Sequence, residues 1–144
     1  MKSVIEHGPV PPERCDEVLA EAAAHVKAVG VKVTSCDGWR IPRGSATARL
    51  VADLGLLALL DAQVVRYGPG GSYDWHTDGP GRGSTTIVQL SDPSWYEGGD
   101  VEIEEFEALL PRARGSVTSF PAQVRHRTQP IVKGERYVLV GWMP

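Results

Sequence analysis

A histidine and an aspartate stand two residues apart near the middle of the chain, at His76 and Asp78. If this segment is a β-strand, the two side chains point to the same face, so an imidazole and a carboxylate lie side by side. Two histidines and one carboxylate bind ferrous iron on one face of the metal and leave the other positions open. The pair therefore supplies two of the three groups of such a site, although a lone His-x-Asp also arises by chance.

The third ligand has to come from another histidine. His7 and His25 fall on polar or loop-like pieces in the first third of the chain, and we expect both to be solvated. His126 lies in segment 123–129, which we expect to be a strand. It is the candidate third ligand, and a hydrogen-bonded structural histidine is the alternative interpretation.

Arg136 follows His126 after a segment with proline and glycine turn signals, 129–135. A strand, a turn and a returning strand would bring Arg136 back beside His126. Its planar guanidinium can hold a carboxylate through two parallel hydrogen bonds, whereas the alternative is a solvated residue on a sheet edge.

The elements that must position these groups change in character near residue 62. Apolar residues recur at three- and four-residue spacing before it and predict two helices, 12–29 and 45–62, with Ser45 as the N-cap of the second. We expect a short strand at 31–35 and a loop at 37–44. After residue 62, β-rich pieces alternate with turn residues and predict strands at 63–67, 73–76, 84–90, 100–105, 115–120, 123–129 and 136–142.

This pattern predicts an α+β protein whose body is a sandwich or jelly roll. The 144 residues fit one domain, with a helical part at about 1–62 and a β core at about 63–144. The net charge of −3 does not favour a general nucleic-acid binder, and two cysteines are too few for a disulfide framework. Without a signal-peptide pattern or a long apolar run, we expect a soluble, cytoplasmic protein with no membrane partner.

Taken together, these segments resemble the Fe(II)/2-oxoglutarate-dependent dioxygenases, with the closer match to the prolyl-4-hydroxylase-like branch. The resemblance spans about residues 63–143. It rests on His76-x-Asp78, His126 and Arg136 and on five surrounding pieces: Tyr67-Gly68-x-Gly70-x-x-Tyr73, Arg82 with Thr86-Ile87-x-x-Leu90, Tyr96-x-Gly98-Gly99-Asp100-Val101-x-Ile103, Gly115-Ser116-x-x-x-Phe120-Pro121, and Pro130-Ile131-x-x-Gly134-Glu135-Arg136-Tyr137 through Trp142.

The resemblance implies a double-stranded β-helix, or jelly roll, supported by two N-terminal helices. It implies a hydroxylase that uses Fe(II), 2-oxoglutarate and O2, with ascorbate as a further candidate cofactor, and that releases succinate and CO2. The implied catalytic iron ligands are His76, Asp78 and His126.

The resemblance also assigns the co-substrate end of the site. Arg136 would hold the distal carboxylate of 2-oxoglutarate, and Tyr67 would lie beside the co-substrate. Thr128 would face the same pocket. Gln89 departs from the family pattern, because close relatives often have a tyrosine there that helps to bind the distal carboxylate.

The substrate is open between a small metabolite, an amino acid and a peptide, including a prolyl peptide. Candidate substrate contacts are Arg82, Trp39 and Arg40, and a solvated loop charge is the alternative for Arg82. Trp75 should point away from a metal held by its neighbours. Nucleic-acid demethylases of the wider superfamily carry a second arginine where this chain has Trp142, so nucleic acid is not expected as a partner.

Two other interpretations stay open. A cupin-type metalloprotein would share the barrel but usually has a His-x-His pair. A non-catalytic relative would use the β-helix as a binding module, because a fold does not guarantee an activity. The sequence leaves the oligomeric state undetermined.

Overall fold

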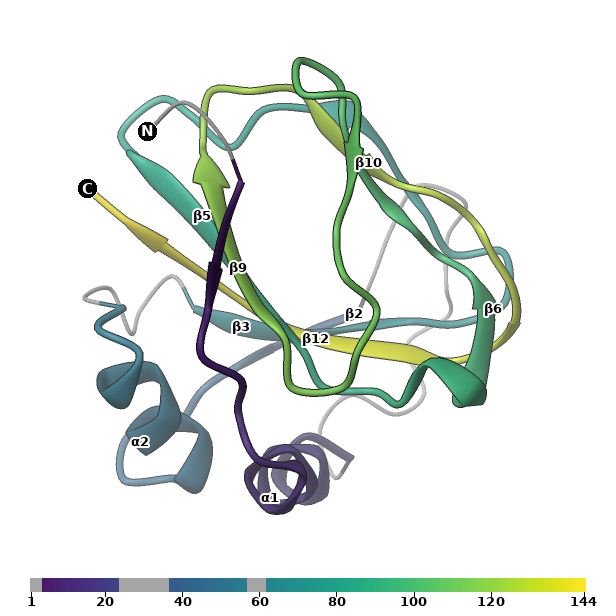
Figure 1. Ribbon diagram of the computed structural model, residues 1–144. Coiled ribbons are helices and arrows are strands. Elements are labelled where there is room, and N and C mark those ends of the chain that lie inside the picture. Colours follow the sequence, from purple (N-terminus) through teal and green to yellow (C-terminus); the bar gives the residue numbers. More distant parts are fainter. Residues whose placement is uncertain (1–3, 24–36, 57–61) are drawn as a thin grey trace.

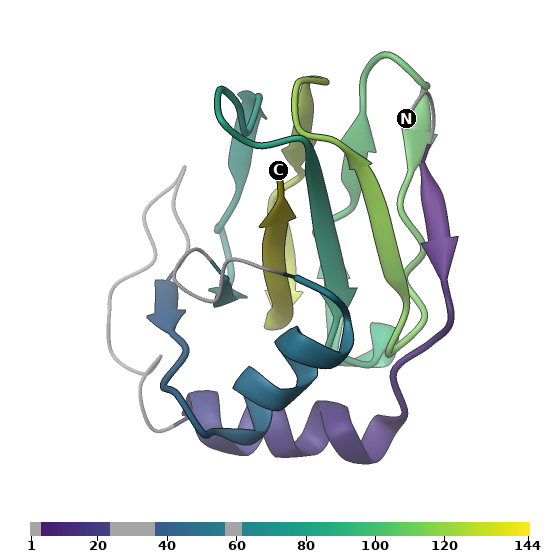
Figure 2. The ribbon, with the colours of Figure 1, turned by 90° about the vertical axis from the view of Figure 1, so that its left-hand side faces the viewer.

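The computed structural model describes residues 4–23, 37–56 and 62–144, with the side chains of all of these except 37–40. Two antiparallel sheets face each other, and two helices cover the outer face of the larger sheet (Figures 1 and 2). This arrangement is the α+β jelly roll that the sequence predicts. Among the residues that the structure describes, no helix has the length and hydrophobicity needed to cross a membrane.

The larger sheet has six strands, in the spatial order β1 (Ile5–His7), β9 (Val117–Pro121), β5 (Ser84–Gln89), β12 (Arg136–Met143), β3 (Gln63–Tyr67) and β2 (Asp37–Arg40). The smaller sheet has four, in the order β4 (Tyr73–His76), β10 (His126–Thr128), β7 (Val101–Ile103) and β8 (Ala108–Leu109). A separate pair joins β11 (Ile131–Gly134) to β6 (Tyr96–Gly98), which follows the short 3-10 helix η1 (Pro93–Trp95).

Side chains of the larger sheet alternate between two buried environments. On β12, Leu139 packs toward the helices, while its neighbour Val138 faces the smaller sheet. Leu139 lies opposite Val64 on one side and Val88 on the other, so one aliphatic row crosses three strands. The two-residue period of a strand thus gives this sheet one helix-facing and one pocket-facing surface.

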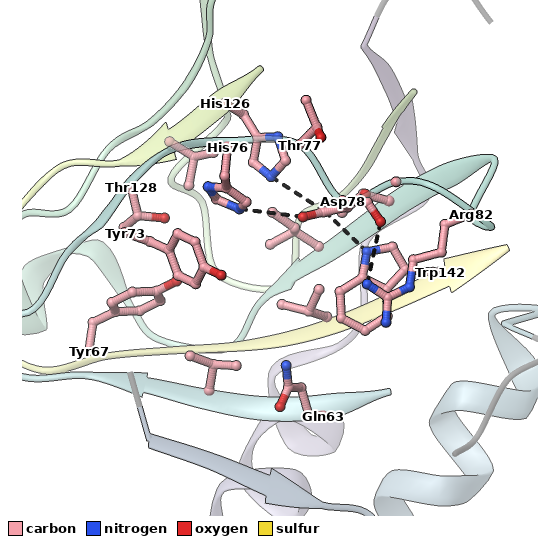
Figure 3. Close-up of a pocket in the computed structure, with 16 residues that line it drawn as sticks. Gln63, Tyr67, Tyr73, His76, Thr77, Asp78, Arg82, His126, Thr128 and Trp142 are labelled. Carbon is pink, nitrogen blue, oxygen red and sulfur yellow. Dashed lines mark hydrogen bonds and ion pairs between the residues drawn. The ribbon is translucent and has the colours of Figure 1, made fainter. Parts of the chain in front are cut away.

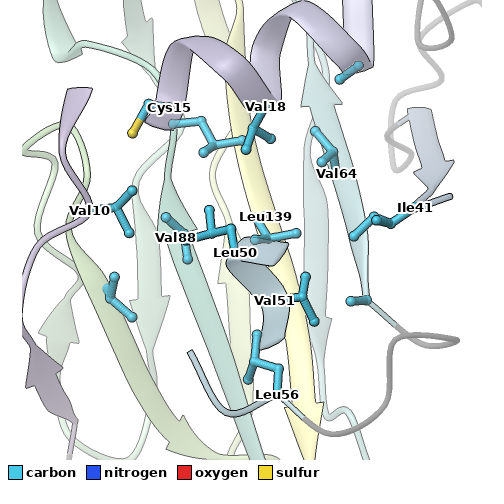
Figure 4. Packing of buried hydrophobic residues seen from close by; sticks show 14 residues of the cluster. Val10, Cys15, Val18, Ile41, Leu50, Val51, Leu56, Val64, Val88 and Leu139 are labelled. Carbon is cyan, nitrogen blue, oxygen red and sulfur yellow. The ribbon is translucent and has the colours of Figure 1, made fainter. Parts of the chain in front are cut away.

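Both helices pack buried side chains against the larger sheet (Figure 4). In α1 (Pro12–Ala23) the buried residues are Cys15, Val18 and Ala22, and in α2 (Ala46–Asp53) they are Thr47, Leu50 and Val51. Ser45 is the N-cap of α2, as predicted, and its hydroxyl accepts the Ala48 N–H at 3.0 Å. The predicted continuation of the first helix over 24–29 lies outside the described residues.

The prediction that the second helix continues to residue 62 is wrong. Gly55 adopts φ +73°, and the N–H groups of Gly55 and Leu56 bond back to Ala52 and Val51 at 3.0 and 3.1 Å. These are the two hydrogen bonds of a Schellman C-cap, which needs a residue in the left-handed region directly after the helix. Gly55 therefore ends the helix instead of weakening its interior.

The predicted loop at 37–44 is also wrong in its first half, because residues 37–40 form edge strand β2. Their backbone pairs antiparallel with β3, from Asp37 opposite Arg66 to Arg40 opposite Gln63. Backbone hydrogen bonds to an existing strand recruit this segment despite its Asp-Gly composition. The strand predicted at 31–35 falls outside the described residues.

The strand predictions after residue 62 are largely confirmed. β3 and β4 have the predicted bounds, and β5, β7, β9, β10 and β12 lie on the predicted segments with shifted ends. The short strands β1, β6, β8 and β11 were not predicted. They contain two to four residues each, too few for a visible alternation.

Candidate metal site and its pocket

Strand pairing brings His76 and His126 together. The two residues lie directly opposite each other on the antiparallel strands β4 and β10. Asp78 follows two residues after His76, and its N–H donates to the carbonyl oxygen of Ala122 at 2.8 Å. The Nε2 atoms of His76 and His126 each lie 3.4 Å from a different carboxylate oxygen of Asp78 (Figure 3). One possible ligand atom from each residue lies within 4.8 Å of the others.

Each histidine is oriented through its other ring nitrogen. Nδ1 of His76 lies 2.6 Å from the carbonyl oxygen of Asp74, and Nδ1 of His126 lies 3.0 Å from that of Val124. A carbonyl oxygen only accepts, so Nδ1 donates in each ring and Nε2 is the nitrogen that faces Asp78. Metal-binding histidines are held in this way. The three residues therefore fit a divalent metal with mixed nitrogen and oxygen ligands.

The carboxylate of Asp78 is held ionised and in a fixed orientation. Burial would raise the pKa of Asp78, but hydrogen bonding with His126, His76 and Thr85 outweighs burial and holds the pKa well below its ordinary value. The Thr85 hydroxyl donates to Oδ2 at 2.6 Å, and the Trp142 indole N–H donates to the same oxygen at 3.1 Å. Sequence reasoning missed both roles, although Thr85 and Trp142 lie opposite each other on β5 and β12.

The three residues open onto a pocket of about 320 Å³ between the two sheets. Tyr67, Tyr73 and Thr128 lie at one end of it, and Arg82 and Trp142 lie at the other (Figure 3). Tyr67 and Thr128 both line this pocket.

Arg136 is buried behind the Tyr67 end of the pocket, with 4% of its surface exposed. It lies opposite Tyr67 on the neighbouring strand, and its guanidinium carbon is 5.6 Å from the centre of the Tyr67 ring. Its Nε donates to Oε1 of Gln89 at 3.1 Å. Gln89 is buried as well and lines a small cavity with Arg136, so it lies behind the main pocket and not in its wall.

The charge of Arg136 has no acidic partner in the described part of the chain, where no carboxylate forms an ion pair with it. Burial lowers the pKa of Arg136, opposed by the hydroxyls of Tyr67 and Tyr96. Buried charges are normally paired, because an unpaired one loses its hydration without compensation. This end of the site therefore suits an anionic ligand, and a carboxylate fits the planar guanidinium.

Of the three candidate substrate residues, the structure describes the side chain of Arg82 alone. Arg82 lies at the pocket wall, with its guanidinium carbon 3.7 Å from the centre of the Trp142 ring and Nη1 3.5 Å from the Asp78 carbonyl oxygen. Trp39 and Arg40 belong to β2, and their side chains are outside the described part of the structure.

Trp75 points to the opposite face of the smaller sheet, as strand alternation predicts. It lines a separate groove with Leu109 of β8 and is absent from the wall of the main pocket. The Arg127 guanidinium carbon lies 4.6 Å from its ring centre.

The β-rich part of the chain matches a known protein family. Residues 62–144 match the model of the 2OG-Fe(II) oxygenase superfamily. A PKHD-type hydroxylase from Picosynechococcus is 36% identical over 85 residues, which cover 54% of this chain and 39% of that relative. The chain thus spans about two fifths of the length of that curated relative.

Two solved structures share the fold over nearly the whole chain. A prolyl-4-hydroxylase from Pseudomonas putida has a TM-score of 0.78 at 18% identity, covering 99% of this chain and 92% of that one. A prolyl hydroxylase from Trichoplax adhaerens, in complex with a hypoxia inducible factor peptide fragment, has a TM-score of 0.74 at 15% identity, covering 99% and 83%. The shared fold is the double-stranded β-helix, and with the family match over most of the β core, this chain belongs to the 2OG-Fe(II) oxygenase superfamily.

Proposed function

We propose that this chain is an Fe(II)- and 2-oxoglutarate-dependent hydroxylase. The observation that supports this most strongly is the convergence of His76, Asp78 and His126 in one pocket, with both Nδ1 atoms bonded to backbone carbonyls. Membership of the superfamily and the hydroxylase names of the matched relatives support the same activity.

In this proposal His76, Asp78 and His126 hold the iron. When bound, ferrous iron together with 2-oxoglutarate and O2 supplies the chemistry that hydroxylates an unactivated C–H bond and releases succinate and CO2. Thr85 and Trp142 keep the Asp78 carboxylate in place through their hydrogen bonds to Oδ2. The protein thus contributes ligand geometry and a shaped, partly dry cavity.

The co-substrate is placed by the residues at the Tyr67 end. Arg136 offers a buried cation for the distal carboxylate, while Tyr67 and Thr128 line the pocket in front of it. A dicarboxylate that reaches from the metal ligands toward Arg136 would serve both the metal and the guanidinium, whose charge has no acidic partner in the described residues. We propose 2-oxoglutarate for this position.

The substrate is proposed to enter at the Arg82 end. A guanidinium there can donate to a backbone carbonyl or a carboxylate, and the Trp142 ring offers a flat apolar surface. Because the Trichoplax relative was solved with a peptide fragment, we propose a peptidyl substrate, with a prolyl residue as one candidate and a free amino acid or small metabolite as the others. The cytoplasmic location stays a prediction from the sequence.

The activity is tested by incubating the Fe(II)-loaded protein with 2-oxoglutarate and O2, together with libraries of proline-containing peptides and free amino acids. Mass spectrometry then detects a product that has gained one oxygen atom, and succinate is measured in the same samples. We expect matched amounts of both products from the wild type and neither from Asp78→Ala. Binding of Fe(II) and 2-oxoglutarate without either product would support the binding module, and failure to bind them would overturn the proposal.

A further inference from the structure

Arg136 belongs to a hydrogen-bonded group with two other buried side chains, Gln89 and Tyr96. Gln89 contributes its amide from β5, and Tyr96 contributes its hydroxyl from the start of β6. Their exposed surface is 3% for Gln89 and 4% each for Tyr96 and Arg136. The same three residues line the small cavity behind the main pocket.

The direction of each hydrogen bond in this group is determined by the chemistry of its partners. The Nε of Arg136 can only donate, so the oxygen of the Gln89 amide must face it, at 3.1 Å. The Gln89 nitrogen then donates to the carbonyl oxygen of Ser91 at 3.1 Å and to the Tyr96 hydroxyl oxygen at 2.9 Å. Because the carbonyl of Ser91 can only accept, the amide cannot flip without losing partners at both ends.

The Tyr96 hydroxyl accepts from the Gln89 nitrogen and lines the same small cavity as Arg136, where it opposes the lowering of the Arg136 pKa by burial. The Tyr96 ring is held from its other side by Arg112, whose guanidinium carbon lies 4.5 Å from the ring centre. Arg112 is itself fixed by Asp100 at 2.8 Å. The hydroxyl that faces Arg136 therefore belongs to a side chain with little freedom to move.

Gly99 lies beside the stem of Arg136. A Cβ added at Gly99 would lie 3.5 Å from the Arg136 Cδ and 2.4 Å from the Ile131 Cδ1, and the residue has φ +72°. The contact with Arg136 would be an ordinary one, so glycine is required here by the close approach to Ile131 and by the positive φ. The stem of Arg136 thus runs past Gly99, while its Nε donates to the Gln89 amide.

We infer that Tyr96, acting with Gln89, is a positioning residue for the co-substrate of the proposed hydroxylase. Gln89 accepts the Nε–H of Arg136 and is itself held by Tyr96, so the guanidinium plane is fixed. The other N–H groups of Arg136 are then available to the distal carboxylate of 2-oxoglutarate. Tyr96 acts from behind the arginine, because it does not line the main pocket. Arginine binds a carboxylate well when its fork is pre-organised, so loss of this support weakens affinity for 2-oxoglutarate.

The inference rests on the proposed function and is tested with Tyr96→Phe, which removes only the hydroxyl. Calorimetry without O2 measures the Kd of 2-oxoglutarate for the Fe(II)-loaded protein, so that no turnover occurs. We expect Kd to rise roughly 5- to 10-fold, because the variant loses one hydrogen bond that holds the binding site of a charged ligand without touching the ligand itself. In turnover assays KM for 2-oxoglutarate should rise by a similar factor while kcat stays nearly constant.

Tyr137→Phe is the matched control. Tyr137 is the next residue on β12, and its hydroxyl donates to Glu135 at 3.1 Å in an exposed position. Tyr137→Phe also loses only a hydroxyl oxygen, but on the other face of the strand. Its Kd for 2-oxoglutarate should equal that of the wild type. A Kd for Tyr96→Phe that equals this control, whatever its melting temperature, would overturn the inference and leave a structural role only.

Gln89→Glu tests the same group in the opposite direction. The carboxylate would pair with Arg136 inside the protein and compete with the co-substrate, so we expect Kd for 2-oxoglutarate to rise by roughly 10-fold or more while the protein stays folded. An unchanged Kd would contradict the inference. If the wild type binds 2-oxoglutarate and both variants bind it equally well, only the inference fails, whereas a wild type that does not bind it refutes the proposed function.

Discussion

The two faces of the larger sheet differ in what they bury. The face toward the helices carries aliphatic side chains such as Val64, Val88 and Leu139, packed against Val18 and Leu50 (Figure 4). The face toward the smaller sheet shares its core with polar groups. From the larger sheet these are Thr85, Gln89 and Arg136, and His126 and Thr128 face them from β10 of the smaller sheet.

The difference separates two kinds of contribution. The helix-facing side removes apolar area from water, which stabilises the fold in proportion to area and needs no particular partner. The pocket-facing side holds groups that must be matched one by one, and in the described residues no buried side-chain nitrogen or oxygen lacks a hydrogen-bond partner. Substitutions on one side should therefore change stability, and substitutions on the other should change ligand binding.

The largest effect is expected for Asp78→Ala on the pocket side. The variant removes one metal ligand, and we expect loss of turnover well beyond the roughly 10- to 100-fold that loss of an outer-shell partner causes. The variant should still fold, because Asp78 lies at the pocket and not in either apolar core. The readouts are succinate formation and metal content.

Asp53→Ala is the control for this experiment, because it removes an exposed carboxylate that pairs with Arg14 at 2.9 Å. Its turnover should match that of the wild type. Full succinate formation by Asp78→Ala would show that Asp78 is not a ligand of a catalytic metal.

Leu50→Ala tests the helix-facing side. Leu50 is 1% exposed and packs between α2 and the larger sheet, so the loss of its side chain should lower the free energy of unfolding by about 2–5 kcal/mol. Chemical denaturation measures this change, while the Kd of 2-oxoglutarate for the folded variant should be unchanged. Leu109→Ala, at a leucine that is 57% exposed, should change stability by about 0.5 kcal/mol or less. Equal losses at both positions would contradict the assigned packing.

Thr85→Val removes a single hydroxyl from the pocket-facing side. The substitution keeps the side-chain shape but removes the hydrogen bond to Oδ2 of Asp78, so we expect metal affinity to fall by roughly 10- to 100-fold. Competition with a coloured chelator measures it. The neighbour Thr86 bonds to Ser119 at 2.7 Å, away from the pocket, and Thr86→Val should leave metal affinity as in the wild type. If both variants bound the metal with the same affinity, Thr85 would have no role in the metal site.

The smallest effect concerns Glu21, whose carboxylate accepts the N–H groups of Ala46 and Thr47 at 2.8 Å each, at the start of α2. Burial would raise the pKa of Glu21, but hydrogen bonds from Thr47 and Ala46 outweigh burial and lower the pKa from its ordinary value of 4.5. The carboxylate is therefore fully stabilising above pH 4.5, and this contribution is lost as the pH falls through the lowered pKa of the folded state.

We therefore expect Glu21→Gln to lose about 1 kcal/mol of unfolding free energy at neutral pH, with the difference from the wild type closing in acid. Denaturation at a series of pH values measures this. Glu17→Gln, at an exposed position of the same helix, should show no such closing difference. A difference for Glu21→Gln that grows in acid would have the wrong sign for this account.

The sequence predicted best what depends on local pattern. β3 and β4 were predicted at their observed bounds, because each is a short β-rich piece followed by turn residues such as glycine and proline. The end of α2 was missed because Gly55 fits a helix interior or a C-cap equally well until the hydrogen bonds of Gly55 and Leu56 are seen. β2 was missed because pairing with β3 forms it, and that pairing is not visible in its own residues.

The site residues also differ in how far local sequence pattern predicts them. The three proposed metal ligands were singled out because His76 and Asp78 share a local spacing and His126 lies in a predicted strand, and the structure brings the three together. Thr85 and Trp142 come from strands far apart in the chain and become partners of Asp78 only through the register of β5 with β12. Gln89 and Tyr96 meet Arg136 in a buried group that no local spacing indicates.

The central claim is that the pocket-facing side holds ferrous iron and 2-oxoglutarate together. The most direct measurement adds 2-oxoglutarate to the Fe(II)-loaded protein without O2 and records the visible absorbance. We predict that a weak charge-transfer band develops and saturates in the wild type and is absent in Asp78→Ala. A wild-type protein that binds Fe(II) but shows no such band, and forms no succinate when O2 is admitted, would contradict the account.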